Sequence, residues 1–396
     1  MIADLFNTFQ LSDLPLSNRM VMAPMTRNRA DGDGNVTPIM VSHYQQRASA
    51  GLIIAESTTV SPEAVGYPFT PGLFTDTHVS SWLRLTNAVH SSGGRIFVQL
   101  QHCGRVSHPS LQPEEASPVA PSPVRPAGKA VTYAGMQDFV RPRELMLAEI
   151  PDLVAQFRHA AALAKRAGFD GVEIHGANGY LIDQFLRDGS NRRGDAYGGI
   201  VGNRMRLLHE ILDAVGEVWP VGRIGVRLTP ENSFNDMVDS DPQAHFEYII
   251  RELGARGLAY VHVLQGDMST KSSVVDYRAL RACFAGTYIA NNGYDLARAK
   301  QAIANGEADL VAFGLPFLAN PDLVRRYRQG LPLNTADPAT FYGGGDAGYT
   351  DYPFFTGEEE LCWNLGDEVD QAALCGFDSM TSIPSWNLAP AMSFGN

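Results

Sequence analysis

Three polar residues stand close together in the segment His175-Gly-Ala-Asn178-Gly-Tyr180, and their types suit one kind of chemistry. His175 and Asn178 can both donate hydrogen bonds, so together they could hold one carbonyl or nitro oxygen of a substrate. Paired donors stabilise the negative charge that grows on such an oxygen when hydride adds to the distal carbon. Tyr180 carries a phenol that is neutral at pH 7 and can donate a proton. In isolation, the spacing of His175 and Asn178 more often reflects a buried histidine and an asparagine turn, and Tyr180 could be a packed tyrosine.

A fourth candidate is Arg227, at the end of the apolar run 224–230. A buried guanidinium needs an anion or several acceptors around it. The residue could therefore serve an anionic ligand or a structural ion pair.

Eight short apolar runs, alternating with helical patterns, would position these residues. Each run is apolar on both faces and ends in polar or glycine residues, which is typical of buried parallel strands. The repeated alternation predicts an α/β fold of the (β/α)8 TIM-barrel class. The runs are 19–25, 51–58, 95–102, 171–176, 224–230, 260–266, 287–293 and 308–314. Helices are predicted at 79–93, 150–168, 203–218, 241–257 and 295–306.

Barrel enzymes hold their active sites at the C-terminal ends of the strands. The residues at those ends include hydrogen-bond donors, one cation and glycines, but few carboxylates and no convincing set of metal ligands. This combination favours an electron-rich, anionic, planar ligand over metal-assisted hydrolysis. The residues are Pro24, Thr26, Ser57, Gln99, His102, His175, Asn178, Tyr180, Arg227, Gln265, Asn292, Gly293 and Gly314.

Two segments depart from the alternation. Residues 103–149 form a long insertion after the third strand, which we expect to cover the active site and to contain a β-hairpin at 130–141. The barrel is expected to occupy residues 1–356. Residues 357–396 form a C-terminal extension that could be a lid, a partner-binding segment or a tail.

The bulk composition excludes several classes of protein. The net charge of -12 argues against a general nucleic-acid binder. The four cysteines form no C-x-x-C pair or His/Cys cluster, so no metal is expected, and reduced thiols fit a cytoplasmic protein. No signal peptide is apparent, and no apolar run approaches the roughly 18 residues of a membrane span. We expect a monomer or homodimer that acts on a small molecule, without nucleic acid or membrane partners.

The segment 175–207 resembles the long signature of the Old Yellow Enzyme family, the FMN-dependent NAD(P)H:flavin oxidoreductases. Further family blocks follow in the right order, and the resemblance covers about residues 3–355. These blocks are VMAPMTR (21–27), QLQHCGR (99–105), GVRLTP (225–230), NGYD (292–295), VAFGLPFLANPDL (311–323) and TFYGGGDAGYTDYP (340–353).

The resemblance implies a ping-pong ene-reductase with FMN as cofactor and NADPH or NADH as hydride donor. The substrate would be an α,β-unsaturated carbonyl or nitro compound that binds after the oxidised nicotinamide has left. His175 and Asn178 would polarise it, and Tyr180 would protonate its α-carbon.

The resemblance also implies the contacts to the flavin and the substrate. Arg227 and Gln99 would lie at the pyrimidine edge, and Thr26 would bond O4. The sequence Pro-Met-Thr, rather than Pro-Met-Cys, places the chain in the branch that lacks a redox cysteine at position 26. The remaining cofactor residues would be Pro24, Met25 and Ser57 along the isoalloxazine, and Asn292, Gly293, Gly314 and Leu315 at the phosphate. The substrate walls would be Gln101, Phe234 and Tyr342.

Two positions depart from the family pattern. Position 315 usually holds an arginine, and Leu315 removes a charge-assisted phosphate contact that would be worth ~1–3 kcal/mol. Arg325 or Arg326 could compensate. Otherwise FMN could be weakly held or lost, and the alternative function would be an acid–base isomerase or cyclase acting on a carbonyl compound. Gln101 replaces a bulky tryptophan of much of the family, which should enlarge the substrate pocket.

One further motif is set aside. The glycines of residues 343–348 fit G-x-G-x-x-G, but the segment follows no predicted strand and opens no evident helix. It therefore fails the structural context of a dinucleotide-binding turn.

Overall fold

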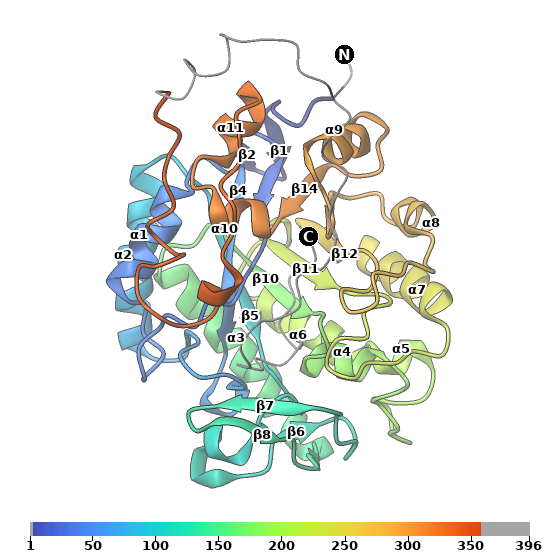
Figure 1. The fold of residues 1–396 in the computed structure, drawn as a ribbon. Coiled ribbons are helices and arrows are strands. Elements are labelled where there is room, and N and C mark those ends of the chain that lie inside the picture. The colour runs from blue at the N-terminus through green and yellow to red at the C-terminus, as the bar shows by residue number, and fades with distance from the viewer. Residues whose placement is uncertain (1–2, 358–396) are drawn as a thin grey trace, which may run out of the picture.

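The computed structural model describes residues 3–357, so the extension predicted at 357–396 lies outside the described residues from 358 onward. Eight parallel strands close into a barrel in the order β3, β4, β5, β10, β11, β12, β13 and β14, with helices around them (Figure 1). The predicted (β/α)8 barrel is confirmed. The strands are β3 Met20–Met22, β4 Leu52–Thr59, β5 Ile96–Gln101, β10 Gly171–Gly176, β11 Ile224–Leu228, β12 Tyr260–Leu264, β13 Tyr288–Asn291 and β14 Leu310–Phe313.

The residues of these eight strands are all buried, because helices cover their outer side and side chains fill the barrel. The parallel register decides which polar side chains become neighbours. It pairs His175 of β10 with Arg227 of β11, and Glu173 of β10 with Gln99 of β5. Residues far apart in the sequence thus meet inside the barrel.

The five predicted helices are present with shifted ends, and the one predicted at 203–218 is divided at Met205 into α5 and α6. Helix α1 was not predicted, although Thr37 followed by Pro38 is a common helix start. The helices are α1 Pro38–Gln46, α2 Asp76–Ser91, α3 Ile150–Arg166, α4 Leu181–Leu186, α5 Val201–Arg204, α6 Arg206–Gly216, α7 Pro242–Gly254, α8 Tyr277–Ala282, α9 Leu296–Ala304, α10 Leu315–Ala319 and α11 Leu323–Gln329.

The insertion after β5 contains the expected hairpin. Strand β7 (Lys129–Thr132) pairs antiparallel with β8 (Gly135–Asp138), and β6 (Val119–Ala120) pairs with β9 (Arg143–Glu144). This small unit projects from one end of the molecule (Figure 1).

A second hairpin, which the sequence did not reveal, lies near the N-terminus. Strands β1 (Phe9–Leu11) and β2 (Leu14–Leu16) pair antiparallel at the end of the molecule opposite to β7 and β8 (Figure 1). Their leucines belong to one apolar cluster with Phe97 and Tyr260 of the barrel strands. The hairpin therefore closes the N-terminal end of the barrel.

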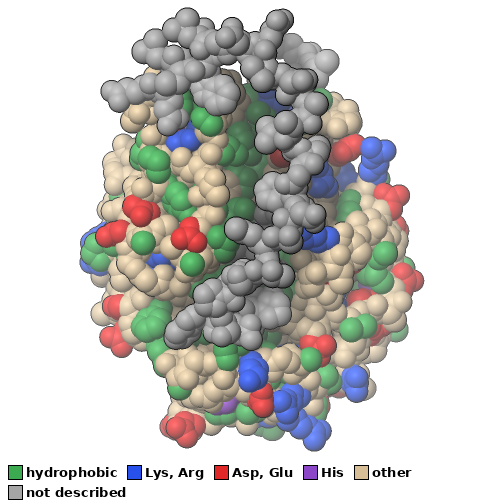
Figure 2. Space-filling view, in the orientation of Figure 1, with side chains coloured by type: hydrophobic (Ala, Val, Ile, Leu, Met, Phe, Trp, Pro, Cys, Tyr) green, Lys and Arg blue, Asp and Glu red, His purple; other side chains and the backbone are tan. Residues whose placement is uncertain are grey.

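On the face shown in Figure 2, acidic and basic side chains are interspersed among polar and apolar ones. Between residues 3 and 357, no helix combines the length and the apolar character needed to cross a membrane.

Glu56 of β4 should make stability depend on pH. The carboxyl is fully buried, accepts a hydrogen bond from the Tyr44 hydroxyl (3.2 Å), and burial raises its pKa to about 7. A pKa above the unfolded value means that stability is full below about pH 4.5 and is lost as pH rises through 7. Between pH 5 and 8 the unfolding free energy should fall by roughly 2–4 kcal/mol relative to Glu56→Gln. Thermal unfolding of both proteins at several pH values measures this, with the exposed Glu63→Gln as control.

Candidate active site

A cavity opens at the C-terminal ends of the barrel strands and encloses, with the solvent at its mouth, about 600 Å³. Eleven of the residues expected to contact flavin or substrate line it. The remaining lining residues are Tyr67, Leu264 and Met268. The eleven are Pro24, Met25, Thr26, Ser57, Gln99, His175, Asn178, Tyr180, Arg227, Phe234 and Tyr342.

His175 is buried at the end of β10, where its register partner is Arg227. Burial lowers the pKa of His175 well below its usual value, and the positive charge of Arg227 lowers it further. The imidazole is therefore neutral at pH 7 and carries one N–H. Nδ1 is buried without a hydrogen-bond partner among the described residues. The ring can thus act as a neutral donor toward a ligand, without the charge of an imidazolium.

Asn178 is held by its neighbours in a left-handed turn with φ +57°. Its N–H donates to Thr229 Oγ1 (2.9 Å), and its carbonyl oxygen accepts from Asn235 Nδ2 (2.8 Å). Its side-chain Oδ1 accepts from Asn232 Nδ2 (3.3 Å), which orients the amide so that Nδ2 is the opposite, donating end. The turn thus presents a fixed donor next to His175.

The following residue, Gly179, explains why this turn needs glycine. It has φ +76°, and a Cβ there would meet Met237 and Asn235 at under 3.0 Å. Its N–H donates to Asp183 Oδ2 (2.8 Å), and Asp183 forms a buried ion pair with Arg187 (2.9 Å). This ion pair fixes the His175–Tyr180 segment and was not identified from the sequence.

Tyr180 directly follows the same turn, and its exposed fraction is 8%. Its hydroxyl donates to the hydroxyl of Tyr67 at 3.2 Å. Burial raises the pKa of both phenols above the ordinary value, so both are protonated at neutral pH. Tyr67 was missed by sequence reasoning, because it lies in a loop without periodicity.

Arg227 has fewer partners than its charge requires. Nη2 donates to Asn291 Oδ1 (2.9 Å) and Nη1 to the carbonyl of Pro24 (3.4 Å), while Nε is buried without a partner. Within residues 3–357, no carboxylate lies within ion-pair distance of it. Burial lowers the pKa of Arg227, whereas Glu173 favours the charged form. An anionic ligand in the cavity would satisfy this guanidinium.

Gln99 is oriented from beneath the cavity by Glu173. Its Nε2 donates to Glu173 Oε1 (2.7 Å), and Glu173 Oε2 lies 2.9 Å from His262 Nδ1. All three side chains are buried. Ser57 of β4 is the register partner of Gln99, and its hydroxyl lies 3.0 Å from that of Thr26. Amide and hydroxyl groups of this kind suit the polar edge of a heterocycle.

The expected phosphate residues lie beside this cavity rather than on its wall. Gly293 and Leu315 line a neighbouring groove, and Gly314 precedes α10. The side chain of Asn292 donates to the carbonyl of Gln265 (2.6 Å). A basic residue does lie at this turn, because Arg298 Nη1 donates to the carbonyl of Gly293 (2.9 Å).

The two arginines expected to compensate for Leu315 form hydrogen bonds with backbone carbonyls of residues 353 and 355. Arg325 donates to the carbonyl of Phe355 (2.9 Å). Arg326 is buried, pairs with Asp322 (2.7 Å) and donates to the carbonyl of Pro353 (2.8 Å). Arg298 is therefore the stronger candidate for a cation near the phosphate.

Gln101, expected on the substrate wall, is not among the residues that line the cavity. It is buried, and its Nε2 donates to Cys103 Sγ (2.8 Å) at the start of the insertion. Tyr67 is the aromatic wall that was not foreseen.

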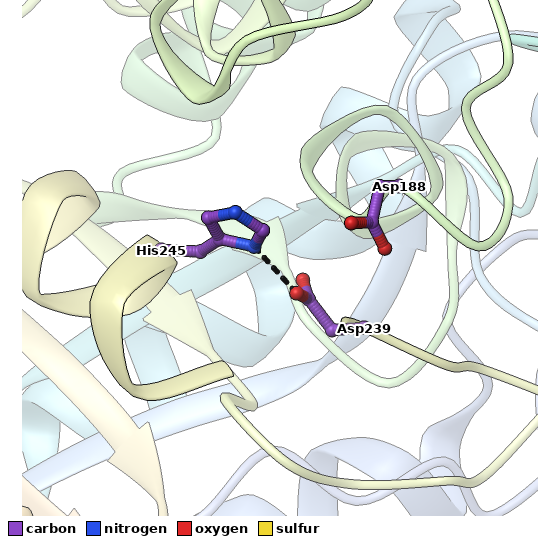
Figure 3. A group of neighbouring side chains, drawn as sticks. All are labelled: Asp188, Asp239 and His245. Atoms are coloured by element: carbon purple, nitrogen blue, oxygen red, sulfur yellow. Dashed lines mark hydrogen bonds and ion pairs between the residues drawn. The ribbon is translucent and has the colours of Figure 1, made fainter. Parts of the chain in front are cut away.

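One group with metal-ligand spacing exists among the described residues, formed by Asp188, Asp239 and His245 (Figure 3). Asp188 and Asp239 lie on loops and His245 lies on α7, and none of the three lines the cavity. His245 Nδ1 is 2.5 Å from Asp239, and Ser240 donates its N–H to Asp188 (3.0 Å). The positive charge of Arg204 also interacts with both carboxylates. These partners serve Asp188 and Asp239 Oδ1, while Asp239 Oδ2 is buried without a partner among the described residues. We interpret the cluster as an ion-pair network that joins α7 to two loops.

Comparison with known proteins agrees with this site. The profile of the NADH:flavin oxidoreductase / NADH oxidase family matches residues 4–334. The chain is 45% identical to a probable flavin mononucleotide-dependent alkene reductase of Leishmania infantum, over 86% of this chain and 94% of the relative. It is 42% identical to 12-oxophytodienoate reductase 1 of Oryza sativa subsp. japonica, over 88% and 93%. The solved structure of morphinone reductase superimposes with a TM-score of 0.87 and 44% identity, covering 91% of this chain and 99% of that one.

Fold and site together define a flavin-binding (β/α)8 barrel. The chain belongs to the NADH:flavin oxidoreductase / NADH oxidase family, and the predicted relationship to the Old Yellow Enzymes is confirmed. The matches do not favour the acid–base isomerase that Leu315 suggested.

The residues present fit FMN, the cofactor of this family. The unpartnered Nε of Arg227 requires an acceptor, and Gln99, Thr26 and Ser57 offer the polar contacts of a pyrimidine edge. Gly293 and Gly314 carry no side chain, so a phosphate could approach the backbone closely at these two positions.

Leu315→Arg is expected to tighten FMN binding about tenfold, because a guanidinium adds charge-assisted hydrogen bonds to the phosphate. Leu315 lines an open groove with Gly293, so the longer side chain has space. Titration of the apoprotein with FMN, followed by flavin fluorescence, measures the dissociation constant. Leu83→Arg on the exposed side of α2 controls for added charge. An unchanged constant would mean that the phosphate is already fully served by other groups.

Proposed function

We propose that this protein is an FMN-dependent ene-reductase, which transfers hydride from NADPH or NADH to the C=C bond of α,β-unsaturated carbonyl or nitro compounds. One observation carries the proposal: the donors His175 and Asn178, the phenol Tyr180 and the cation Arg227 line a single cavity. Two of the relatives are named for alkene and 12-oxophytodienoate reduction, which supports the same substrate class. Bound FMN supplies the hydride chemistry between the nicotinamide and the β-carbon of the substrate.

His175 and Asn178 bind and polarise the substrate. Both donate to its carbonyl or nitro oxygen, where negative charge accumulates as the β-carbon is reduced. The hydrogen bond from Asn232 to Asn178 Oδ1 keeps the donating end of that amide fixed. Because these donors are held in place before the substrate arrives, little reorganisation is needed in the transition state.

Tyr180 completes the reduction by giving its hydroxyl proton to the α-carbon. Burial raises its pKa well above the usual value, so the proton is present throughout the neutral range. The neutral His175 ring packs edge-on against Tyr180, with ring centroids 5.0 Å apart. This contact orients the phenol toward the same end of the cavity.

Arg227 and Gln99 hold the electron-rich edge of the cofactor. The guanidinium places a buried positive charge where a reduced flavin is anionic, and Glu173 turns the amide of Gln99 into position. Thr26 and Ser57 contribute hydroxyl groups to the same cavity.

The test is direct. The purified protein should show flavin absorbance, or should take up FMN stoichiometrically. It should then oxidise NADPH or NADH under anaerobic conditions when 2-cyclohexenone is added, and yield cyclohexanone. A colourless protein that ignores added FMN would contradict the proposal and would favour the isomerase alternative.

A further inference from the structure

The hydroxyl of Tyr180 has a second hydroxyl as its neighbour. Tyr67 Oη lies 3.2 Å from Tyr180 Oη, and the two rings meet edge to face with centroids 6.3 Å apart. The two residues are 113 positions apart in the sequence, so the pairing is a product of the fold. Asn235 also forms a hydrogen bond with Tyr67, which lowers the pKa of its phenol against the larger effect of burial.

A second groove lies on the far side of Tyr67. Its lining includes the exposed residues Asp31, Phe69, Ser110 and Tyr133, so it is open to solvent. Of the described residues, Tyr67 alone contributes to both this outer groove and the active-site cavity. Its side chain therefore forms a partition between the solvent-filled groove and the place where Tyr180 acts.

We propose that Tyr67 is a relay residue, which passes protons from water in the outer groove to Tyr180 during turnover. The proposal rests on the proposed role of Tyr180 as proton donor. As the Tyr180 O–H bond breaks and its proton joins the α-carbon, the Tyr67 hydroxyl turns and gives its own proton to Tyr180 Oη. Water in the outer groove then protonates Tyr67 and leaves hydroxide, which the buffer neutralises. These steps are proton transfers only, and no group is oxidised or reduced.

The relay answers a physical difficulty at this site. A phenolate left on Tyr180 beside bound product would be a buried charge, and such a charge is costly without a partner. Of the ionisable groups that interact with Tyr180, Tyr67, Cys103 and Tyr342 can only add negative charge. The cation Arg227 also interacts with Tyr180, but it has no proton route to water through the outer groove, whose lining does not include it. Cys103 lines neither the active-site cavity nor the outer groove, so its thiol gives water no route to Tyr180. Of these neighbours, Tyr67 alone also lines the outer groove, which is open to water.

Tyr67→Phe, which removes only the relay hydroxyl, tests the proposal. The FMN-loaded enzyme is reduced anaerobically and mixed with 2-cyclohexenone in mixtures of H₂O and D₂O. We expect the reoxidation rate to fall about 10²-fold, at the lower end of the usual range for one proton-transfer group. The wild type should show a curved dependence on the deuterium fraction, since two protons move together. The variant should show a linear dependence.

A second readout does not depend on activity. In the apoprotein labelled with ¹³Cζ-tyrosine, the resonance that Tyr180→Phe removes should shift in Tyr67→Phe, because its hydrogen-bond partner is gone. Tyr197→Phe serves as the matched control, since this hydroxyl is bonded to Glu210 outside the cavity. It should leave rate, isotope dependence and the Tyr180 resonance unchanged.

The outcomes separate the two hypotheses. If Tyr180→Phe reoxidises at the wild-type rate, the proposed donor role is wrong and the relay falls with it. If Tyr180→Phe is slow but Tyr67→Phe keeps both the wild-type rate and the curved isotope dependence, the relay alone is overturned.

Discussion

Replacement of both His175 and Asn178 by alanine is expected to slow reoxidation of the reduced enzyme by 2-cyclohexenone about 10³-fold. Removal of one preorganised donor from an oxyanion site costs about 10²–10³ in rate. The two donors should act as a unit on a single oxygen, so their effects should not simply multiply. Each single variant should therefore show most of the loss.

The effect should be constant between pH 6 and 8. Burial and the charge of Arg227 hold the pKa of His175 well below that window, so the ring stays neutral throughout it. If the histidine acted as an imidazolium, the wild-type advantage would instead grow as the pH fell.

Stopped-flow measurement of reoxidation with wild type, both single variants and the double variant tests this expectation. His108→Gln, in the insertion and outside the cavity lining, is the histidine control. The dissociation constant for FMN should change little in all of them. A double variant that reoxidises within a few-fold of wild type would remove His175 and Asn178 from the proposed mechanism.

Arg227→Met should have the largest effect on the cofactor, weakening FMN binding by about 10² or more. Loss of one partner from a buried charged contact costs about 2–5 kcal/mol. The same substitution should leave the apoprotein equally stable or more stable, because the unpartnered Nε and the desolvation of the guanidinium are both removed. FMN binding and apoprotein stability should therefore move in opposite directions.

Two measurements test these opposite effects on FMN binding and apoprotein stability: titration of the apoprotein with FMN, and thermal unfolding with and without FMN. Arg223→Met is the control, since Arg223 directly precedes the same strand but pairs with Asp13. A marked fall in apoprotein stability, with FMN affinity preserved, would identify Arg227 as a structural residue. Arg227→Lys keeps the charge but loses the forked geometry of the guanidinium. Its affinity for FMN should therefore lie between those of the wild type and Arg227→Met.

The barrel and much of the site could be predicted from the sequence because both depend on local pattern. Each strand is a continuous apolar run, and parallel strands in a barrel all present their C-terminal ends at one rim. Once the strands were assigned, His175 and Arg227 had to lie at the same rim. The register of β10 and β11 further makes them direct neighbours.

Other features depend on contacts that no local pattern encodes. Tyr67 reaches Tyr180 across 113 positions from a loop after β4. Gln101 shares a strand face with Gln99 by simple alternation, yet its amide turns to Cys103 in the insertion. The ion pair of Asp183 and Arg187 serves a turn that only the folded chain brings against Thr229 and Asn232. Long loops and buried polar networks are thus the parts that sequence alone leaves open.

The β1–β2 hairpin has a consequence for engineering. It seals the barrel at the end remote from the chemistry, where Leu11, Leu14 and Leu16 join the apolar core. The determinants of folding are therefore concentrated at one pole, and those of selectivity at the other. A library that varies the half-buried cavity residues Phe234, Met268 and Tyr342 should yield mostly folded proteins with altered substrate range. A library of the same size directed at the hairpin should yield mostly aggregated protein.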